Sequence, residues 1–355
     1  MLTALVLLLV AALSAVNGAN DVSKGVATLA GSGVTKYRTA VIWGAATTLA
    51  GCLLSGFFAD RMLKLFTAGI VTAQPTSAFA AAVICGAAGW VAIATLTKLP
   101  VSTTHAIIGS LLGAGLLFSP ESVAWGSVAA RLVVPLLLSI AISYALSATL
   151  NRLFHASEAT SSDDECVCVG VEQLDTGAGT IPQVAVTTDT VEACSRKTGV
   201  IGFGVDKLHW ASSGAVGLAR GLNDTPKLVA LGMAVSGETI GLFGLLFLVS
   251  GSMLAGSLIG GGRVAKVLAE KVVTMNHREG FLANLATATL VGFGANLGLP
   301  MSTTHVSTGA IAGIAGGQTG RLNRRTLRDL LLAWTVTPIV AGLIAALVFL
   351  AARSG

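Results

Sequence analysis

One six-residue sequence occurs twice in this chain, as PVSTTH at Pro100–His105 and as PMSTTH at Pro300–His305, 200 positions later. A second pair of motifs lies nearer the start of each half, where Asn20-Asp21 recurs as Asn223-Asp224, 203 positions later. Either match alone is compatible with chance. Two motifs that recur in the same order and at nearly the same spacing indicate an internal duplication, so we expect two copies of one structural unit.

The composition places both copies in a lipid bilayer. Hydrophobic residues make up 53% of the 355 residues and charged residues only 11%, and the mean hydropathy is +0.80. About a quarter of the residues are charged in ordinary soluble domains, so this chain cannot cover a soluble core. A soluble enzyme, a nucleic-acid-binding protein and a disordered chain are excluded. Apolar runs such as 5–12 lack the alternation of barrel strands and predict an all-α polytopic membrane protein.

Apolar segments of spanning length, about 20 residues each, form two groups of five. They are 1–31 (interrupted), 39–58, 76–98, 101–118 and 127–150, then 208–234 (interrupted), 237–262, 280–299, 300–318 and 329–352. We expect a first membrane repeat at 1–150, a polar linker loop at 151–202 and a second repeat at 203–355. The segments 101–118 and 300–318 are counted as crossings, and re-entrant hairpins are the alternative.

Basic residues predict the orientation. Loops 36–38, 263–278 and 321–328 are rich in Lys and Arg, which prefer the cytoplasmic side, and only Arg61 and Lys64 oppose this arrangement. The count places both termini outside a cell membrane and loop 151–207 in the cytosol. Because each half has an odd number of segments, the second repeat is expected to be inverted relative to the first, as in many secondary transporters.

The repeated Pro-x-Ser-Thr-Thr-His motif has the chemistry of an anion site. Proline suits the first turn of a helix, where the N–H groups are unpaired and bind anions. An open helix end within a membrane must line a cavity, and two such ends from inverted repeats can face one point. We therefore expect a site for a tetrahedral oxyanion that needs no arginine; the alternative is that the hydroxyls bond only to their own helices. The residues are Ser102, Thr103, Thr104, Ser302, Thr303 and Thr304.

The repeated Asn-Asp motif predicts a cation site. An ionisable residue within a membrane segment is costly and indicates function, and Asn20, Asp21, Asn223 and Asp224 offer hard oxygen ligands. The glycine that precedes each motif would permit an unwound backbone with further carbonyl ligands. A helix cap is the alternative role of these residues.

Lys24 and Lys227 each follow an aspartate of this motif by three residues, which places them on the same helical face. The simplest role is an ion pair that lowers the cost of burying both charges. The ammonium could instead replace a coordinated cation, or add positive charge near the anion. If both side chains reach the membrane surface, none of these roles applies.

These motifs resemble those of the inorganic phosphate transporter (PiT) family, over both repeats but not the linker. The resemblance implies inverted repeats and secondary uptake of phosphate with Na⁺ or H⁺, and some relatives carry sulfate. It also implies that the Ser and Thr residues bind the oxyanion and that the Asn and Asp residues bind the coupling cation. The family commonly has Asn where this chain has Lys24 and Lys227. That departure favours H⁺ over Na⁺ and indicates a branch that could use another oxyanion.

Other residues have weaker signals. His105, His305 and Glu238 are candidate proton carriers. For the two histidines, a neutral ring bonded to a backbone carbonyl is the slightly preferred alternative. In the linker, three cysteines with C-x-C spacing fall short of a four-ligand metal site, although His155 would complete a set. Free thiols are therefore expected at Cys166, Cys168 and Cys194, and no metal centre.

Together these features predict a symporter of inorganic phosphate coupled to H⁺ or Na⁺, with a sulfate or other tetrahedral-oxyanion permease as the alternative. An intramembrane hydrolase that uses Ser102 and His105 is disfavoured because an enzyme has little reason to duplicate its nucleophile. A channel is a third class. We expect no cofactor beyond the coupling cation and no nucleic-acid partner, and no motif decides whether the protein forms a homodimer.

Overall fold

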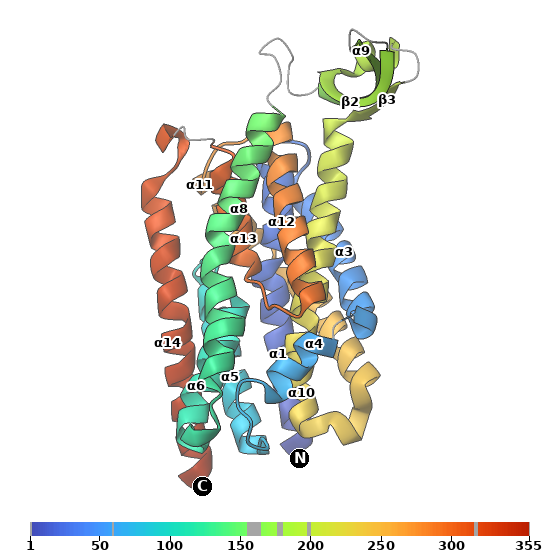
Figure 1. Cartoon of the computed structure of the whole chain (residues 1–355). Coiled ribbons are helices and arrows are strands. Elements are labelled where there is room, and N and C mark those ends of the chain that lie inside the picture. Colours follow the sequence, from blue (N-terminus) through green and yellow to red (C-terminus); the bar gives the residue numbers. More distant parts are fainter. Residues whose placement is uncertain are drawn as a thin grey trace.

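The computed structural model describes residues 2–58, 60–154, 165–175, 180–196, 200–315 and 319–354. These residues form an elongated bundle of helices with a small β-sheet at one end, and both chain termini lie at the opposite end (Figure 1). Seven of the described helices are long and apolar enough to cross a membrane. The predicted helical membrane architecture is therefore confirmed.

The first half of the chain runs through the bundle three times. Helices α1 (Leu2–Asp21) and α2 (Ser23–Gly31) make the first pass, and α3 (Tyr37–Phe58) makes the second. The short helix α4 (Asp60–Ala68) leads to a hairpin of α5 (Ser77–Leu96) and α6 (Thr103–Phe118). The last pass joins α7 (Trp125–Ser127), a π-helical turn (Val128–Val133) and α8 (Val134–Leu153).

The second half has the same order of elements. Helix α10 (Val205–Gly260) contains two passes joined at Gly241, whose φ of 63° favours glycine. Helix α11 (Gly262–Lys271) leads to a hairpin of α12 (His277–Leu297) and α13 (Thr303–Gly313). The last pass is α14 (Arg324–Ser354).

The second helix of each hairpin is short for a membrane crossing. Helix α6 has 16 residues and α13 has 11, which at 1.5 Å per residue gives roughly 24 and 17 Å, against a hydrocarbon core of about 30 Å. The α5–α6 hairpin lies toward the end with the termini, and α12–α13 lies toward the end with the sheet (Figure 1). These short helices favour re-entrant hairpins, the stated alternative, over the counting of 101–118 and 300–318 as crossings, whereas α5 and α12 are among the seven helices long enough to cross.

The expected unwinding at the Asn-Asp motifs is absent. A turn at Val22 separates α1 from α2, but α10 continues through Asn223 and Asp224 without a break. The preceding glycines serve close packing instead. A Cβ on Gly18 would lie 2.1 Å from the carbonyl oxygen of Met253, and one on Gly221 would lie 2.4 Å from that of Thr48.

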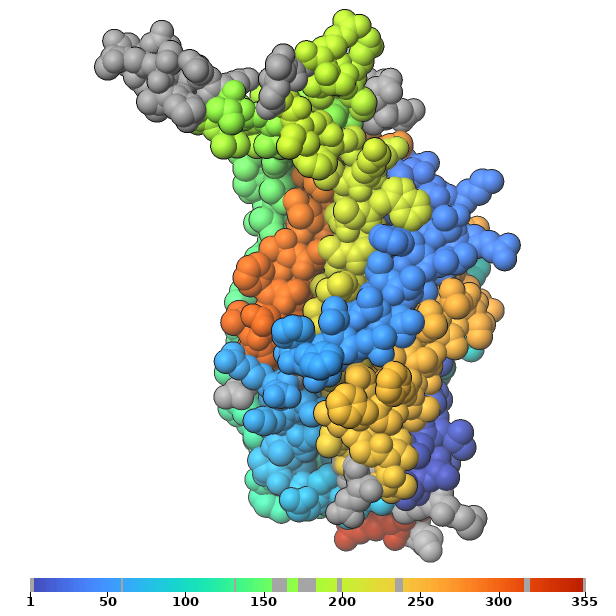
Figure 2. Space-filling view, turned by 90° about the vertical axis from the view of Figure 1, so that its right-hand side faces the viewer, coloured from blue at the N-terminus to red at the C-terminus, as the bar shows by residue number. Residues whose placement is uncertain are grey.

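The linker contains a β-sheet that the polar composition of 151–202 did not predict. Strands β1 (Glu165–Asp175), β2 (Thr180–Thr190) and β3 (Val200–Gly204) form an antiparallel sheet in the order β2-β1-β3, with α9 (Val191–Arg196) against it. We call the described parts of 165–204 the sheet lobe. It projects beyond the helices, as Figure 2 shows.

Free thiols were expected at all three linker cysteines, and this is wrong for two of them. The structure joins Cys168 to Cys194 in a disulfide and leaves Cys166 free. The pairing depends on α9 folding back onto β1, and a contact between residues 26 positions apart is not visible in the local sequence. His155, the fourth residue considered for a metal set, lies outside the described residues.

A helix cap and an ion pair hold the polar end of the α12–α13 hairpin. Asn276 and Glu279 form a capping box at the start of α12. Arg321, in the connection that follows α13, donates to both oxygens of Glu279 at 2.7 and 2.8 Å. These hydrogen bonds raise the pKa of the Arg321 guanidinium. The polar end of this hairpin is therefore tied together by ion pairs and caps.

Small residues let helices of the two halves meet at backbone distance, which is how membrane helices pack. Near Gly18, Gly256 of α10 faces α1, and a Cβ on it would lie 1.8 Å from the carbonyl oxygen of Ala15. We expect Gly256→Ala to lower the free energy of unfolding by about 1–3 kcal/mol, because the added methyl group overpacks this contact. Denaturant unfolding of the purified protein in detergent measures the effect.

Gly251→Ala is the matched control. Gly251 is on the same helix and exposed, and a Cβ there would meet no atom within 4 Å. Equal stability of the two variants would contradict the assignment of Gly256 to a backbone contact.

Candidate substrate and ion site

The tips of the two hairpins meet inside the bundle. The Thr104 hydroxyl donates to the carbonyl of Met301 at 3.4 Å, and the Thr304 hydroxyl donates to the carbonyl of Val101 at 2.8 Å. Met301 is the counterpart of Val101 in the duplicated motif, so the two hydrogen bonds are related by the repeat. The motifs that are 200 residues apart in the chain therefore form one buried cluster.

The serines of the motif are helix caps. The Ser102 hydroxyl accepts a hydrogen bond from the N–H of His105 at 3.3 Å, and Ser302 accepts one from His305 at 3.2 Å. Helices α6 and α13 therefore begin after these serines, and Pro100 and Pro300 precede the cap instead of occupying the first turn. The alternative of bonding to their own helices applies to the serines, whereas Thr104 and Thr304 bond to the opposite hairpin.

The asparagines hold the hairpin tips in place. Asn20 donates to the Thr95 hydroxyl and to the Leu99 carbonyl, both at 3.0 Å, and accepts from the N–H of Val101 at 3.3 Å. In the second half, Asn223 also bonds to the backbone of the hairpin tip. It donates to the carbonyl of Met301 at 2.9 Å and accepts from the N–H of Met301 at 3.1 Å. The side-chain amides thus satisfy backbone groups that the hairpin turns leave free.

Lys24 and Lys227 each place an ammonium among three oxygen atoms. The Lys24 ammonium donates to the carbonyl and side-chain oxygens of Asn20, at 3.2 and 3.0 Å, and forms an ion pair with Asp21. The Lys227 ammonium donates to the Thr104 hydroxyl at 2.7 Å, to Asp224 at 3.1 Å and to the Met301 carbonyl at 3.3 Å. Both side chains are fully buried, so the alternative that they reach the surface is wrong.

Arg220 is a buried cation that the sequence analysis did not single out. Its guanidinium donates to the Thr48 hydroxyl at 3.2 Å and to the Asn17 side-chain oxygen at 3.5 Å, and its Nε lies 3.9 Å from Asp224 without a hydrogen-bond partner. Arg220 follows Asn17 by 203 positions, which is the offset of the Asn-Asp motifs. Equivalent positions of the two halves therefore touch, and an arginine in an apolar segment was the signal that was missed.

Asn17 also links the two aspartates. Its amide donates to Asp21 at 3.1 Å and to Asp224 at 3.3 Å. The cluster thus holds three cations, Lys24, Lys227 and Arg220, and two carboxylates, which gives a formal excess of one positive charge. The hydroxyl of Thr103 completes the contacts, at 3.4 Å from Asp21. A buried group of this kind is electrostatically incomplete without an anion.

The histidines face away from this cluster. The rings of His105 and His305 are 4.5 Å apart, and His305 is 4.2 Å from the Trp334 ring. Both line an apolar cavity of about 320 Å³ beside α8 and α14. His305 lies 3.2 Å from the Leu136 carbonyl, which matches the carbonyl-bonded alternative. The side chain of Glu238, the third candidate proton carrier, lies outside the described residues.

Comparisons with known proteins agree with this arrangement. A family model described as the phosphate transporter family matches residues 17–345. A protein of Pyrococcus abyssi described as a phosphate permease is 27% identical, with 94% of this chain and 93% of that protein covered. A chloroplast inorganic phosphate transporter of Arabidopsis thaliana is 25% identical, with 90% and 67% covered.

A solved structure described as the sodium-dependent phosphate transporter has the same fold, with a TM-score of 0.81, 19% identity and 99% of each chain covered. Because the family model spans nearly the whole chain, this protein belongs to the phosphate transporter family, and it is a membrane transporter and not an enzyme.

Proposed function

We propose that this protein is a secondary transporter that takes up inorganic phosphate together with protons, and that the anion binds at the cluster between the two hairpin tips. The observation that carries this proposal is the excess of buried positive charge from Lys24, Lys227 and Arg220 beside the two hairpin ends. Such a pocket attracts an anion, and the helix N-termini add their own partial charge.

Hydroxyls at the start of α6 and α13 would turn from their present acceptors to the anion when it binds. Thr103, Thr104, Thr303 and Thr304 are buried at these N-termini, whereas Ser102 and Ser302 shape the site as caps. The carboxylates of Asp21 and Asp224 add acceptors. A protonated phosphate can donate a hydrogen bond to a carboxylate, but sulfate at neutral pH only accepts. The acidic residues therefore favour phosphate, and sulfate remains the second candidate because the cluster carries net positive charge.

The lysines support proton coupling. Each ammonium lies at hydrogen-bond distance from three oxygens, which is the kind of position that a sodium ion would take. A fixed internal cation neutralises these oxygens, so Na⁺ is not needed at Asn20, Asp21, Asn223 or Asp224. The structural neighbour described as sodium-dependent is only 19% identical, and its ion requirement is not transferred to this chain.

Alternating access follows from two inverted halves at 1–150 and 203–355 that move around a fixed central site. We place the sheet lobe and residues 151–207 in the cytosol and both termini outside. Basic loops gather at the lobe end, where Tyr37 bonds to Glu270, Arg278 pairs with Glu165 and Arg321 pairs with Glu279. Positively charged segments prefer the cytoplasmic face.

Phosphate uptake into liposomes tests the function directly. We expect labelled phosphate to accumulate when a pH gradient is imposed, without Na⁺, and excess unlabelled sulfate to leave the rate nearly unchanged. Uptake that requires a Na⁺ gradient would contradict the role given to the lysines. Sulfate uptake in place of phosphate uptake would move the protein to the alternative oxyanion, and flux without any gradient dependence would indicate a channel.

Replacement of Lys24 tests whether its ammonium takes the place of a cation. We expect Lys24→Asn to lower uptake in Na⁺-free buffer at least about tenfold, since Asp21 loses its partner, and added Na⁺ to restore part of the activity. Lys36→Asn is the control, because Lys36 is exposed at the lobe end. A monodisperse gel-filtration profile confirms folding. If Na⁺ has no effect on a folded Lys24→Asn protein, the substitution of an ammonium for a cation is wrong.

Arg220 should affect the affinity for the anion. A charge-assisted hydrogen bond contributes about 1.5–3 kcal/mol, so we expect Arg220→Gln to raise the KM for phosphate by roughly tenfold or more. Arg263→Gln removes an equal charge from an exposed site on α11 and controls for the overall field. An unchanged KM in a folded Arg220→Gln protein would place the anion away from this cluster.

A further inference from the structure

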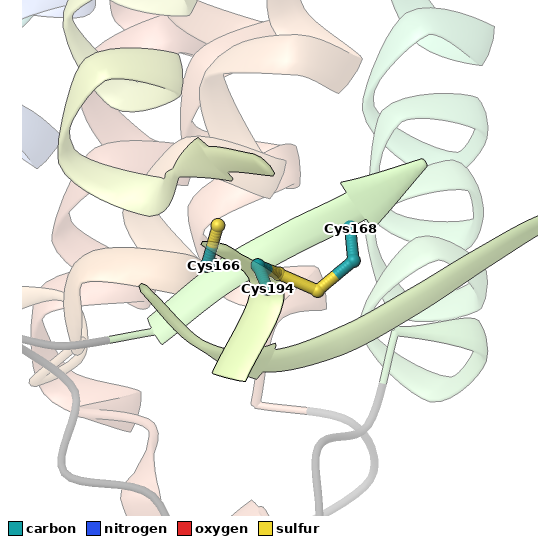
Figure 3. Close-up of side chains that lie close together, drawn as sticks. All are labelled: Cys166, Cys168 and Cys194. Atoms are coloured by element: carbon teal, nitrogen blue, oxygen red, sulfur yellow. A yellow bond between two sulfur atoms is a disulfide. The ribbon is translucent and has the colours of Figure 1, made fainter. Parts of the chain in front are cut away.

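The sheet lobe contains a cluster of three cysteines outside the transport site. Cys166 and Cys168 project from the same face of β1, and Cys194 reaches them from α9, as Figure 3 shows. The three sulfur atoms lie within 4.8 Å of one another, and each residue is only 1% exposed. The geometry is therefore that of a compact group of soft ligands within bonding reach of a single ion.

The lobe depends on this cluster for its core. A unit of about 40 residues rarely buries enough apolar surface to be stable, and usually needs a disulfide or a metal ion. Among the described residues of the lobe, the buried cluster consists of the three cysteines, with Val200 partly buried against them. Other apolar side chains such as Val171, Val184 and Ile201 are more than half exposed. A covalent or metal link between the cysteines must replace the missing hydrophobic core.

Strand β3 leaves room for the cluster. A Cβ on Gly202 would lie 3.0 Å from the Cys166 sulfur and 3.0 Å from the Cys194 Cβ. Any larger residue at position 202 would crowd the sulfur atoms. Glycine here therefore keeps open the space that the cysteines occupy beside β3. Glu165, directly before Cys166, pairs with Arg278 of α12 at 2.8 Å and fixes the lobe to the α12–α13 hairpin.

The compartment decides which link forms. On the orientation proposed above, the lobe faces the cytosol, where the thiol pool reduces disulfides. Reduction of the Cys168–Cys194 bond takes two electrons and two protons from a dithiol and yields two thiols, so three thiols then lie together. Thiolates are the preferred ligands of soft d¹⁰ metal ions.

We propose that the three cysteines bind one thiophilic d¹⁰ metal ion such as Zn²⁺. Each thiol loses its proton to solvent when the ion binds, and an external ligand such as water takes the fourth position. Zinc–sulfur bonds of about 2.3 Å in a tetrahedral site separate the sulfurs by roughly 3.8 Å. The Cys168 and Cys194 sulfurs, which are bonded to each other in the structure, would move apart to this spacing after reduction, and Cys166 already lies within 4.8 Å of both. The ion would stiffen β1, whose Glu165 pairs with Arg278 of α12.

Metal titration of the full chain in detergent tests the proposal. The protein is reduced with a phosphine, stripped with a chelator and titrated with Zn²⁺, and with Co²⁺ as a spectroscopic probe of thiolate ligation. We expect one equivalent to bind with a thiolate-to-cobalt absorption band. Cys166→Ser should weaken Zn²⁺ binding at least tenfold, although it leaves the Cys168–Cys194 pair intact. Cys85→Ser, on α5, should bind like the parent protein.

Two results would overturn the proposal. One is undiminished binding in Cys166→Ser, or no binding in the reduced parent protein. The other is thiol counting on freshly lysed cells that finds Cys168 and Cys194 oxidised and no metal, because the disulfide would then be the native link. Neither measurement requires transport. The metal site can therefore be disproved while the proposed transport function stands, and the transport function can be disproved while the metal site stands.

Discussion

Burial of five charged side chains between the hairpin tips is the constraint on which the rest of the structure depends. A charge within a membrane protein must be paired and hydrogen-bonded, because its desolvation is otherwise too costly. Lys24 and Lys227 pair with the aspartates three residues earlier, and Asn17 joins the aspartates to each other. The lysines find these aspartates on their own helical face, whereas the contacts of Asn17 with Asp224 and Arg220, and of Lys227 with Thr104, join different passes. The bundle must therefore be closed before these contacts are complete.

The repeat explains how one chain meets this constraint. Two copies that face each other supply two Asn-Asp motifs, two capped hairpin helices and two crossed Thr–carbonyl hydrogen bonds. The two halves differ in charge at one pair of equivalent positions in the cluster, where the first half has Asn17 and the second half has Arg220. Because these equivalent residues touch, a single substitution changes the charge at the centre of the site. A duplicated scaffold therefore carries an asymmetric charge, and that asymmetry gives the cluster its formal excess of positive charge.

Close backbone packing gives this cluster a rigid setting. Gly18 and Gly256 let α1 meet α10, and Gly221 lets α10 meet α3. Two side-chain oxygens and one backbone carbonyl then surround each of the Lys24 and Lys227 ammonium groups. The continuous helix at Asn223 and Asp224 leaves no free carbonyls of its own there, which is why the Met301 carbonyl of the opposite hairpin serves as an acceptor for Lys227. The charged cluster is thus assembled by packing between elements.

The sequence by itself determined the membrane class, the duplication and the repeated Asn-Asp and Ser-Thr-Thr motifs, with their lysines, that line the cluster. These features rest on composition, spacing and residue types, which are local properties of the chain. Only the tertiary structure decided that Arg220 lies against Asn17, that Thr104 bonds to Lys227 and the opposite hairpin, that the Asn-Asp helices stay continuous, and that three linker cysteines meet in a sheet lobe. Each of these features depends on contacts between residues that are distant in the chain, or on competition between packing and backbone geometry. A local sequence pattern carries no information on which distant partner will satisfy a buried group.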